Sequence, residues 1–142
     1  MHFEKIHNKG QARLFKNDFL EALTKAHPLV IWGMYIPILT FLIYTAANRY
    51  NYSTTTILIV FFAGMFFWSL FEYVAHRFIF HWIPKTPTAT KIVYTLHGNH
   101  HHYPRDRQRL FMPPLPSIIL SSAIFGTMYL ISGSYAFMFF PG

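Results

Sequence analysis

Three long segments of the sequence carry no charged residue, and this feature restricts the fold more than any other. The segments are 29–47, 53–71 and 115–140, which contain nineteen, nineteen and twenty-six residues. Because an α-helix rises about 1.5 Å per residue, nineteen residues give roughly 28 Å of helix, close to the roughly 30 Å hydrocarbon core of a bilayer. Only 12% of all residues are charged, against about 25% in soluble domains. The sequence therefore predicts an all-α integral membrane bundle; the alternative is a set of helices buried in a soluble core.

Two of these segments contain residues that interrupt a helix. Pro37 falls inside the first, and membrane helices tolerate a proline better than soluble helices do. The third is too long for one untilted span and carries Ser-Gly-Ser at 132–134. We therefore expect a span at about 115–131, then a turn, then the start of another apolar element.

The N-terminal segment 1–28 is mixed polar and charged, and it contains no early apolar core of a cleavable signal peptide. Phe15, Phe19 and Leu23 recur every four residues, which favours a short helix at 17–26 lying on the membrane surface. A loose N-terminal arm is the alternative.

The distribution of basic residues predicts the orientation of the spans. Residues 1–28 hold five Lys and Arg, residues 72–114 hold six, and the connection 48–52 holds one. Because positively charged loops stay on the cytoplasmic side, the N-terminus and segment 72–114 are expected there. This topology explains the net charge of +7 without nucleic acid, and no nucleic-acid-binding pattern is present.

Six of the nine histidines lie in the polar connection between the second and third spans. The stretch "EYVAHRFIFHW" contains two of them, about 140° apart on an α-helix, where they would bracket a site. In "LHGNHHHYP", His97, His100 and His101 stand at positions i, i+3 and i+4. On an α-helix these three side chains fall within about 100° of one another. Imidazole is the commonest metal ligand in proteins. The pattern predicts a metal site with the ligands His76, His81, His97, His100 and His101.

Other polar residues have weaker assignments. His102 is expected to point away from the site, and His2, His7 and His27 are expected to be solvated. Glu72 lies one turn before His76. It either orients an imidazole from outside the ligand set or marks the helix end. Asp106 is the other candidate for such an orienting role. Arg105 and Arg107 are expected to contact the membrane surface, and an acidic lipid head group or a carboxylate is the alternative partner.

The histidine motifs resemble those of the fatty acid hydroxylase superfamily of integral membrane enzymes. The family pattern pairs H-x4-H with H-x2-HH, and its fatty acid 2-hydroxylase branch follows the second motif with further positions. In this sequence the stretches "FEYVAHRFIFHW" and "LHGNHHHYPRDRQRLFMPP" carry the match, which covers about residues 68–116. The further positions are met by Pro104, Asp106, Arg109, Leu110, Pro113 and Pro114.

The resemblance implies a four-span helical fold with a cytosolic histidine-rich cap. It implies a dinuclear metal centre held by the five histidines, with iron expected in the working enzyme and zinc as an isolated form, and no catalytic residue beyond the ligands. The implied reaction uses O2 to hydroxylate a lipid acyl chain at C2, in a fatty acid or a sphingolipid. The implied partners are the lipid, the membrane and a separate electron donor such as cytochrome b5 or a reductase.

The resemblance also has a departure. The family has two more histidine motifs after its third and fourth spans, and no histidine follows His102. We therefore expect a C-terminally incomplete membrane hydroxylase domain over 1–142 with about three spans. Its parts are a cytosolic arm (1–28), a two-span hairpin (29–71), a cytosolic histidine segment (72–114), and a third span with the start of a fourth (115–142).

Three alternatives stay open at this point. A sterol or carotenoid hydroxylase, or a desaturase, of the same superfamily would carry similar motifs. A non-catalytic membrane protein with a structural zinc site, or an inactive fragment, would also hold a metal. A metal transporter is disfavoured because it would place ligands inside the spans, and the three uncharged segments contain no histidine.

Overall fold

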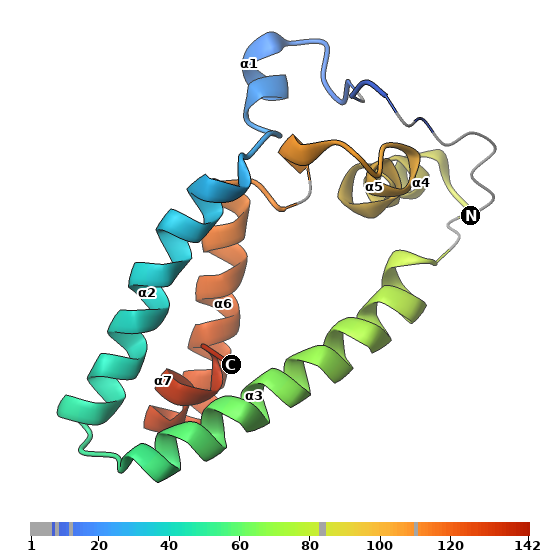
Figure 1. Cartoon of the computed structure of the whole chain (residues 1–142). Helices are drawn as coiled ribbons and strands as arrows, with labels where there is room; N and C mark the ends of the chain where they lie inside the picture. Colours follow the sequence, from blue (N-terminus) through green and yellow to red (C-terminus); the bar gives the residue numbers. More distant parts are fainter. Residues whose placement is uncertain (1–6, 8, 12, 83–84, 110) are drawn as a thin grey trace. The chain divides into compact units, whose positions relative to one another are not determined.

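The computed structural model describes residues 7, 9–11, 13–82, 85–109 and 111–142, and it has no strand among them. The described chain is a succession of helices joined by short connections (Figure 1). It divides into two compact units: unit 1 comprises 1–31 and 73–113, and unit 2 comprises 32–72 and 114–142. The all-α prediction is confirmed.

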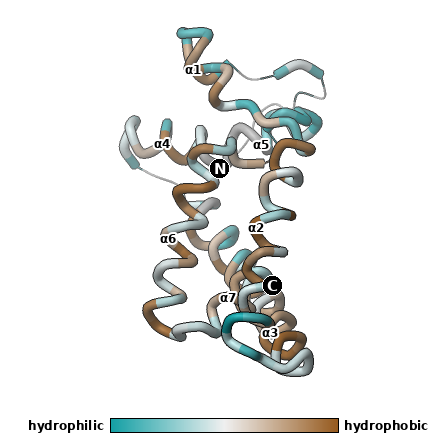
Figure 2. Tube along the Cα trace, turned by 90° about the vertical axis from the view of Figure 1, so that its left-hand side faces the viewer, coloured by the Kyte–Doolittle hydropathy of each residue, from teal (hydrophilic) through white to brown (hydrophobic). Residues whose placement is uncertain are grey.

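Three helices are long and apolar enough to cross a membrane: α2 (Pro28–Asn48), α3 (Thr54–Ala75) and α6 (Pro114–Ser132). Figure 2 shows hydrophobic residues along each of them. Only 17%, 6% and 0% of the residues in their most apolar windows are buried within the protein. Soluble helices bury their apolar stripe, so side chains exposed on every side indicate lipid as the surrounding solvent. This exposure argues against a soluble core and agrees with the predicted spans.

Several side-chain hydroxyls on the spans find partners within the protein, as a hydrocarbon environment requires. α2 continues through Pro37 as predicted. Hydroxyl groups along the helices donate to the carbonyl oxygen one turn back, as Thr40 does to Ile36 at 2.7 Å. The hydroxyls of Thr45, Ser69, Thr127 and Ser132 do the same. Between α2 and α6, the Tyr35 hydroxyl pairs with Ser117 Oγ at 2.6 Å and donates to Ser121 Oγ at 3.0 Å. Such bonds join helices where water is absent.

The C-terminal part of unit 2 turns back after the third span. The turn predicted at 132–134 is confirmed by a short 3₁₀ helix, η4 (Gly133–Tyr135), which Gly133 enters with a positive φ of 59°. The predicted apolar element after it is α7 (Ala136–Phe139). Met138 is fully buried, and the Phe125 ring lies 5.3 Å from that of Phe137. α7 therefore supplies the buried centre of unit 2.

Gly64 allows α7 to approach α3, and this contact gives a testable difference between two glycines. A Cβ at Gly64 would overlap the carbonyl oxygen of Phe139, whereas one at Gly126 would meet nothing within 4 Å. We expect Gly64→Ala to lower the thermal unfolding midpoint in detergent. Gly126→Ala should leave it unchanged or raise it, because alanine favours a helix by up to about 1 kcal/mol over glycine. Equal midpoints for the two variants would contradict this packing.

Unit 1 contains short helices with recognisable starts. α1 (Asp18–Ala22) begins after Asn17, whose side chain accepts from the amides of Phe19 and Leu20. α4 (Pro87–Val93) begins after Thr86, which caps Ala89, with proline at the first position. The remaining elements are η1 (His76–Phe80), η2 (Tyr94–Gly98), α5 (Asn99–His102) and η3 (Arg107–Arg109).

The N-terminal segment is bound to the histidine segment rather than loose. His7 N donates to His102 O at 2.8 Å, and Ala26 N donates to Gln108 O at 2.8 Å. The Gln11 side chain donates to Asp106 Oδ1 at 3.1 Å. The predicted helix at 17–26 is therefore only partly present. α1 ends at Ala22, and the chain then runs on so that Ala26 can bond to the distant segment.

Candidate metal centre

Each histidine motif begins on an unusually wide helical turn, with His76 on η1 and His97 on η2. η1 continues α3, and η2 continues α4, each with hydrogen bonds that reach back five residues instead of four. At the end of η1, His81 N donates to His76 O at 3.2 Å. Wide turns of this kind are rare and occur often at functional sites.

The wide turn changes the relation between His76 and His81. On a regular α-helix they would lie about 140° apart. In the structure their ring centroids are 4.5 Å apart. The physical reason is that each residue of a wider turn advances by a smaller angle, so residues five apart come to the same side. The separation of about 140° expected for these two histidines is therefore corrected: their rings lie close together.

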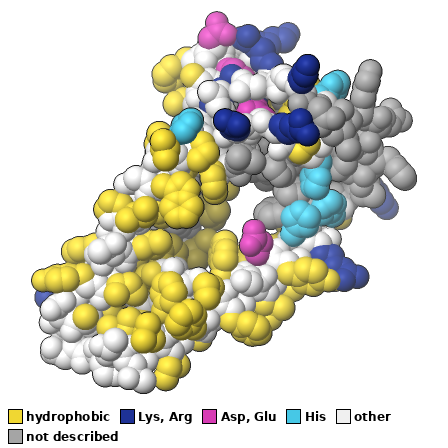
Figure 3. All heavy atoms as spheres, in the orientation of Figure 1, with side chains coloured by type: hydrophobic (Ala, Val, Ile, Leu, Met, Phe, Trp, Pro, Cys, Tyr) yellow, Lys and Arg dark blue, Asp and Glu magenta, His cyan; other side chains and the backbone are white. Residues whose placement is uncertain are grey.

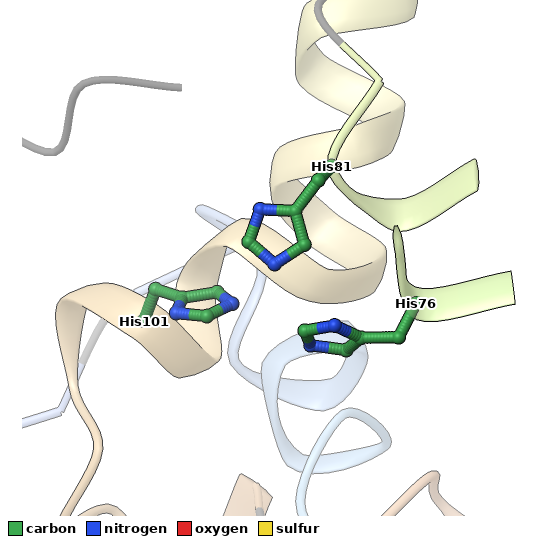
Figure 4. Close-up of side chains that lie close together, drawn as sticks. All are labelled: His76, His81 and His101. Atoms are coloured by element: carbon green, nitrogen blue, oxygen red, sulfur yellow. The ribbon is translucent and has the colours of Figure 1, made fainter. Parts of the chain in front are cut away.

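A third histidine from the second motif completes a triad. His101, on α5, places its ring centroid 5.0 Å from that of His81 and 6.1 Å from that of His76. One ligand nitrogen from each ring lies within 4.8 Å of the other two. Figure 4 shows the three rings turned toward a common volume, two from one segment and one from another. Folding thus brings together imidazoles that are separate in the sequence.

The triad fits a transition metal by its donor chemistry. An imidazole nitrogen binds such an ion at about 2.0–2.1 Å, so nitrogens on one ion are at most about 4.2 Å apart. A small inward rotation of the rings closes the observed spacing to that value. His81 and His101 are half-buried while His76 is exposed, which leaves one side of the cluster open. Imidazole nitrogens suit iron, zinc, copper and nickel alike.

The other histidines are placed as follows. His97 and His100 lie on the backbone of η2 and α5, but their side chains are outside the described residues, as is all of His2. The ring of His102 lies against Tyr94, with centroids 5.2 Å apart, outside the triad.

Burial raises the pKa of the Tyr94 phenol above its usual value, as does the nearby Tyr103 phenol, while the Arg109 charge acts in the opposite direction.

Outside the motifs, His7 and His27 in the N-terminal segment are exposed, as predicted. His7 stacks on Tyr103 with centroids 5.1 Å apart, and His27 accepts a bond from the amide of Leu29. Figure 3 shows several histidine side chains at the surface.

The two predicted orienting acids differ in their surroundings. Glu72 is exposed in the last turn of α3, and its role toward an imidazole stays a prediction. Asp106 is buried. Its carboxylate accepts from Gln11, from the Gln108 amide at 3.1 Å and from Arg109 at 3.1 Å. An orienting role for Asp106 also stays a prediction, but these contacts assign it to an ion-pair network.

This network includes a residue that sequence reasoning missed. Glu21, on α1, is buried and pairs with Arg109, a guanidinium that is itself only 5% exposed. Glu21 also accepts from the amides of Leu14 at 2.9 Å and Phe15 at 3.1 Å. Of the three arginines in "PRDRQR", Arg105 and Arg107 are exposed while Arg109 connects two acids. The only sequence signal for Glu21 was its place between apolar residues of a short helix.

The pKa of Glu21 reflects these contacts. Burial alone would raise it, but hydrogen bonds from the Phe15 and Leu14 amides and from Arg109, with the charge of Arg109, lower it from 4.5 to about 2. A folded-state pKa below the unfolded value stabilises the fold above the unfolded pKa, and the stability is lost as pH falls through the folded pKa.

We therefore expect Glu21 to contribute about 3 kcal/mol to the stability of the metal-free protein at neutral pH. This contribution should disappear as the pH falls from 4.5 to about 2. Chemical unfolding at several pH values would measure it, with Glu21→Gln as the reference. If the difference in unfolding free energy between wild type and Glu21→Gln stayed constant over this pH interval, the carboxylate would not be held as described.

The chain is similar to enzymes that hydroxylate lipids. It is 35% identical over 138 residues to the ceramide very long chain fatty acid hydroxylase SCS7 of Saccharomyces cerevisiae, a match that covers 95% of this chain and 35% of the relative. It is 34% identical to the dihydroceramide fatty acyl 2-hydroxylase FAH2 of Arabidopsis thaliana, covering 84% of this chain and 50% of the relative. With the human fatty acid 2-hydroxylase it shares 29% over 138 residues.

A solved structure agrees with the sequence matches. The structure titled "Full length scs7p (only hydroxylase domain visible)" superimposes with a TM-score of 0.81 at 34% identity. The superposition covers 94% of this chain and 51% of that one. No family model matches the chain. The chain spans about a third to a half of the length of the curated relatives it matches. By sequence and by fold, the chain is a homologue of the fatty acid 2-hydroxylases.

Proposed function

We propose that this chain is part of an oxygen-dependent membrane hydroxylase that acts at C2 of a fatty acyl chain. The convergence of His76, His81 and His101 carries this proposal, because it builds a metal-binding cluster at the end of a candidate span. A site there is accessible to a substrate that dissolves in the bilayer and to an electron donor in solution. The names of the relatives support a fatty acid or ceramide-type lipid as the substrate.

The proposed ligands are the triad together with the two histidines whose side chains are not described. These are His76, His81, His97, His100 and His101. A bound pair of iron ions would supply the chemistry, in which O2, a pair of electrons and a pair of protons turn a C–H bond into C–OH and water. Neutral imidazoles leave the positive charge of the metals uncompensated. Of the two acids in 72–114, Asp106 is already paired with Arg109.

The metal and the product test this proposal. The protein purified from membranes is expected to contain iron by elemental analysis. Membranes that contain it and an electron donor should accumulate 2-hydroxy acyl lipids, measured by mass spectrometry after hydrolysis. Bound zinc with no oxygen consumption would favour a structural metal site instead. An unsaturated product, or hydroxylation of a sterol, would assign the chain to another reaction of the superfamily.

The cytoplasmic orientation of the histidine segment is part of the proposal. It is supported by eleven of the twelve basic residues, which lie in 1–28 and 72–114. Because the chain has no cysteine, a single cysteine reports its own position. Asn51→Cys, in the connection between α2 and α3, should react with an impermeant thiol reagent on intact cells, and Arg107→Cys only after permeabilisation. The reverse labelling pattern would overturn the orientation.

A further inference from the structure

An apolar surface on the N-terminal segment of unit 1 is left uncovered by the rest of that unit. It consists of four side chains that are 39%, 71%, 45% and 51% exposed: Phe15, Phe19, Leu20 and Leu23. We call this group the α1 apolar face. Two large residues of it, Phe19 and Leu23, are four apart and therefore lie on the same side of a helical turn. Clustered apolar side chains of this kind mark a contact with a partner or with lipid.

The buried side of α1 prevents this face from turning inward. Glu21 lies between the exposed residues in sequence but points the opposite way, into the pair with Arg109. Its second oxygen holds the amides of Leu14 and Phe15. Rotating α1 to bury Phe19 would pull the Glu21 carboxylate out of these bonds. The same network that holds α1 in unit 1 therefore keeps its apolar face outward.

The position of α1 in the chain places a membrane within reach. α1 ends at Ala22, and the candidate span α2 begins at Pro28. The five residue steps from Leu23 to Pro28 extend at most about 17 Å. Their actual reach is shorter, because Thr24 N and Lys25 N bond back to Glu21 O and Ala22 O. The first side chains of α2 within unit 1, Leu29 and Val30, are also exposed.

The charges beside the face fit a lipid surface better than a protein groove. Lys16 and Arg13 are exposed on the loop that precedes α1, where Arg13 pairs with Asp18. Lys25 follows α1, 3.6 Å from Glu21. Long basic side chains extend from an apolar face to the phosphate level, as amphipathic segments at membrane interfaces do. We propose that the α1 apolar face inserts into the lipid interface on the side where α2 begins, so that unit 1 contacts the bilayer at α1.

Single-cysteine labelling tests this without relying on the proposed enzymatic function. An environment-sensitive fluorophore is attached at Phe19→Cys or Leu23→Cys in the whole chain, reconstituted in phosphatidylcholine–phosphatidylserine vesicles. The matched control is Asp18→Cys on the same helix, where the side chain is 91% exposed. We expect the probes at 19 and 23 to emit at shorter wavelength, to be quenched by brominated lipid and to resist iodide. The probe at 18 should show the reverse.

Two results would overturn the proposal. Probes at 19 and 23 that iodide quenches as strongly as the probe at 18 would place the face in water. Protection from iodide without quenching by brominated lipid would mean that protein, such as a second copy of this chain, covers the face. If one variant fails to fold, as judged by its elution from a sizing column, Leu20→Cys provides another position on the same face.

Discussion

Replacing His101 by alanine in the full-length protein is expected to remove most of the bound metal and to abolish hydroxylation. His101 is the member of the triad that the second motif contributes, and its ring lies 5.0 Å from His81 and 6.1 Å from His76. Loss of a partner outside the ligand set already costs about 10–100-fold in metal affinity, so loss of a ligand should cost at least about 100-fold. Elemental analysis of the purified protein measures the metal, and mass spectrometry of hydrolysed lipids measures the product.

His102 provides the matched control for this prediction. It is the next residue on α5, but its ring lies against Tyr94 instead of the triad. His102→Ala should therefore keep most of the metal. Equal metal loss in His101→Ala and His102→Ala would contradict the assignment of His101 as a ligand and of His102 as a residue outside the site. Full metal content and activity in His101→Ala would refute the assignment of this triad as a metal centre.

Arg109→Ala is expected to destabilise unit 1 by about 3–5 kcal/mol, the typical cost of removing one partner from a buried ion pair. Arg109 connects Glu21 with Asp106, and all three side chains are less than 10% exposed, at 5%, 9% and 2%. Without the guanidinium, two carboxylates remain buried without their shared positive partner. Chemical unfolding of the metal-free protein in detergent, monitored by circular dichroism, would measure the loss of unfolding free energy.

Arg107 is the control for Arg109, since it is an arginine of the same segment but exposed. Arg107→Ala should change stability by no more than about 0.5 kcal/mol, as surface substitutions usually do. A second comparison uses Arg109→Lys, which keeps the charge but cannot present two nitrogens in one plane to two acids. Similar unfolding free energies for Arg107→Ala and Arg109→Ala would contradict a buried network.

The spans could be predicted from the sequence because a bilayer imposes a local requirement. Each span needs about twenty apolar residues in a row, and the segments 29–47 and 53–71 meet this requirement. Their boundaries agree with those of α2 and α3 to within a few residues. The turn at 132–134 was also readable, since glycine and serine there interrupt an apolar run. None of these features depends on what a distant part of the chain does.

The histidine motifs were readable as a metal site by residue type and spacing, but their arrangement was not. A regular α-helix was the only geometry that spacing could suggest, and it separated His76 from His81. The wide turn η1 brought them together. A helix adopts such a turn because of its surroundings, so no count along the sequence reveals it. The convergence of His101 with them also depended on the path of the chain between the motifs.

The sequence by itself determined that the chain is helical, that it is suited to a membrane, and that it carries two histidine motifs of the hydroxylase type. These are properties of composition and short-range spacing. Only the tertiary structure decided that Glu21 meets Arg109 across 88 positions and that three imidazoles share one volume. The physical reason is that a buried charge needs a partner, but any of several distant residues could supply it. Folding selects that partner by bringing the two segments together.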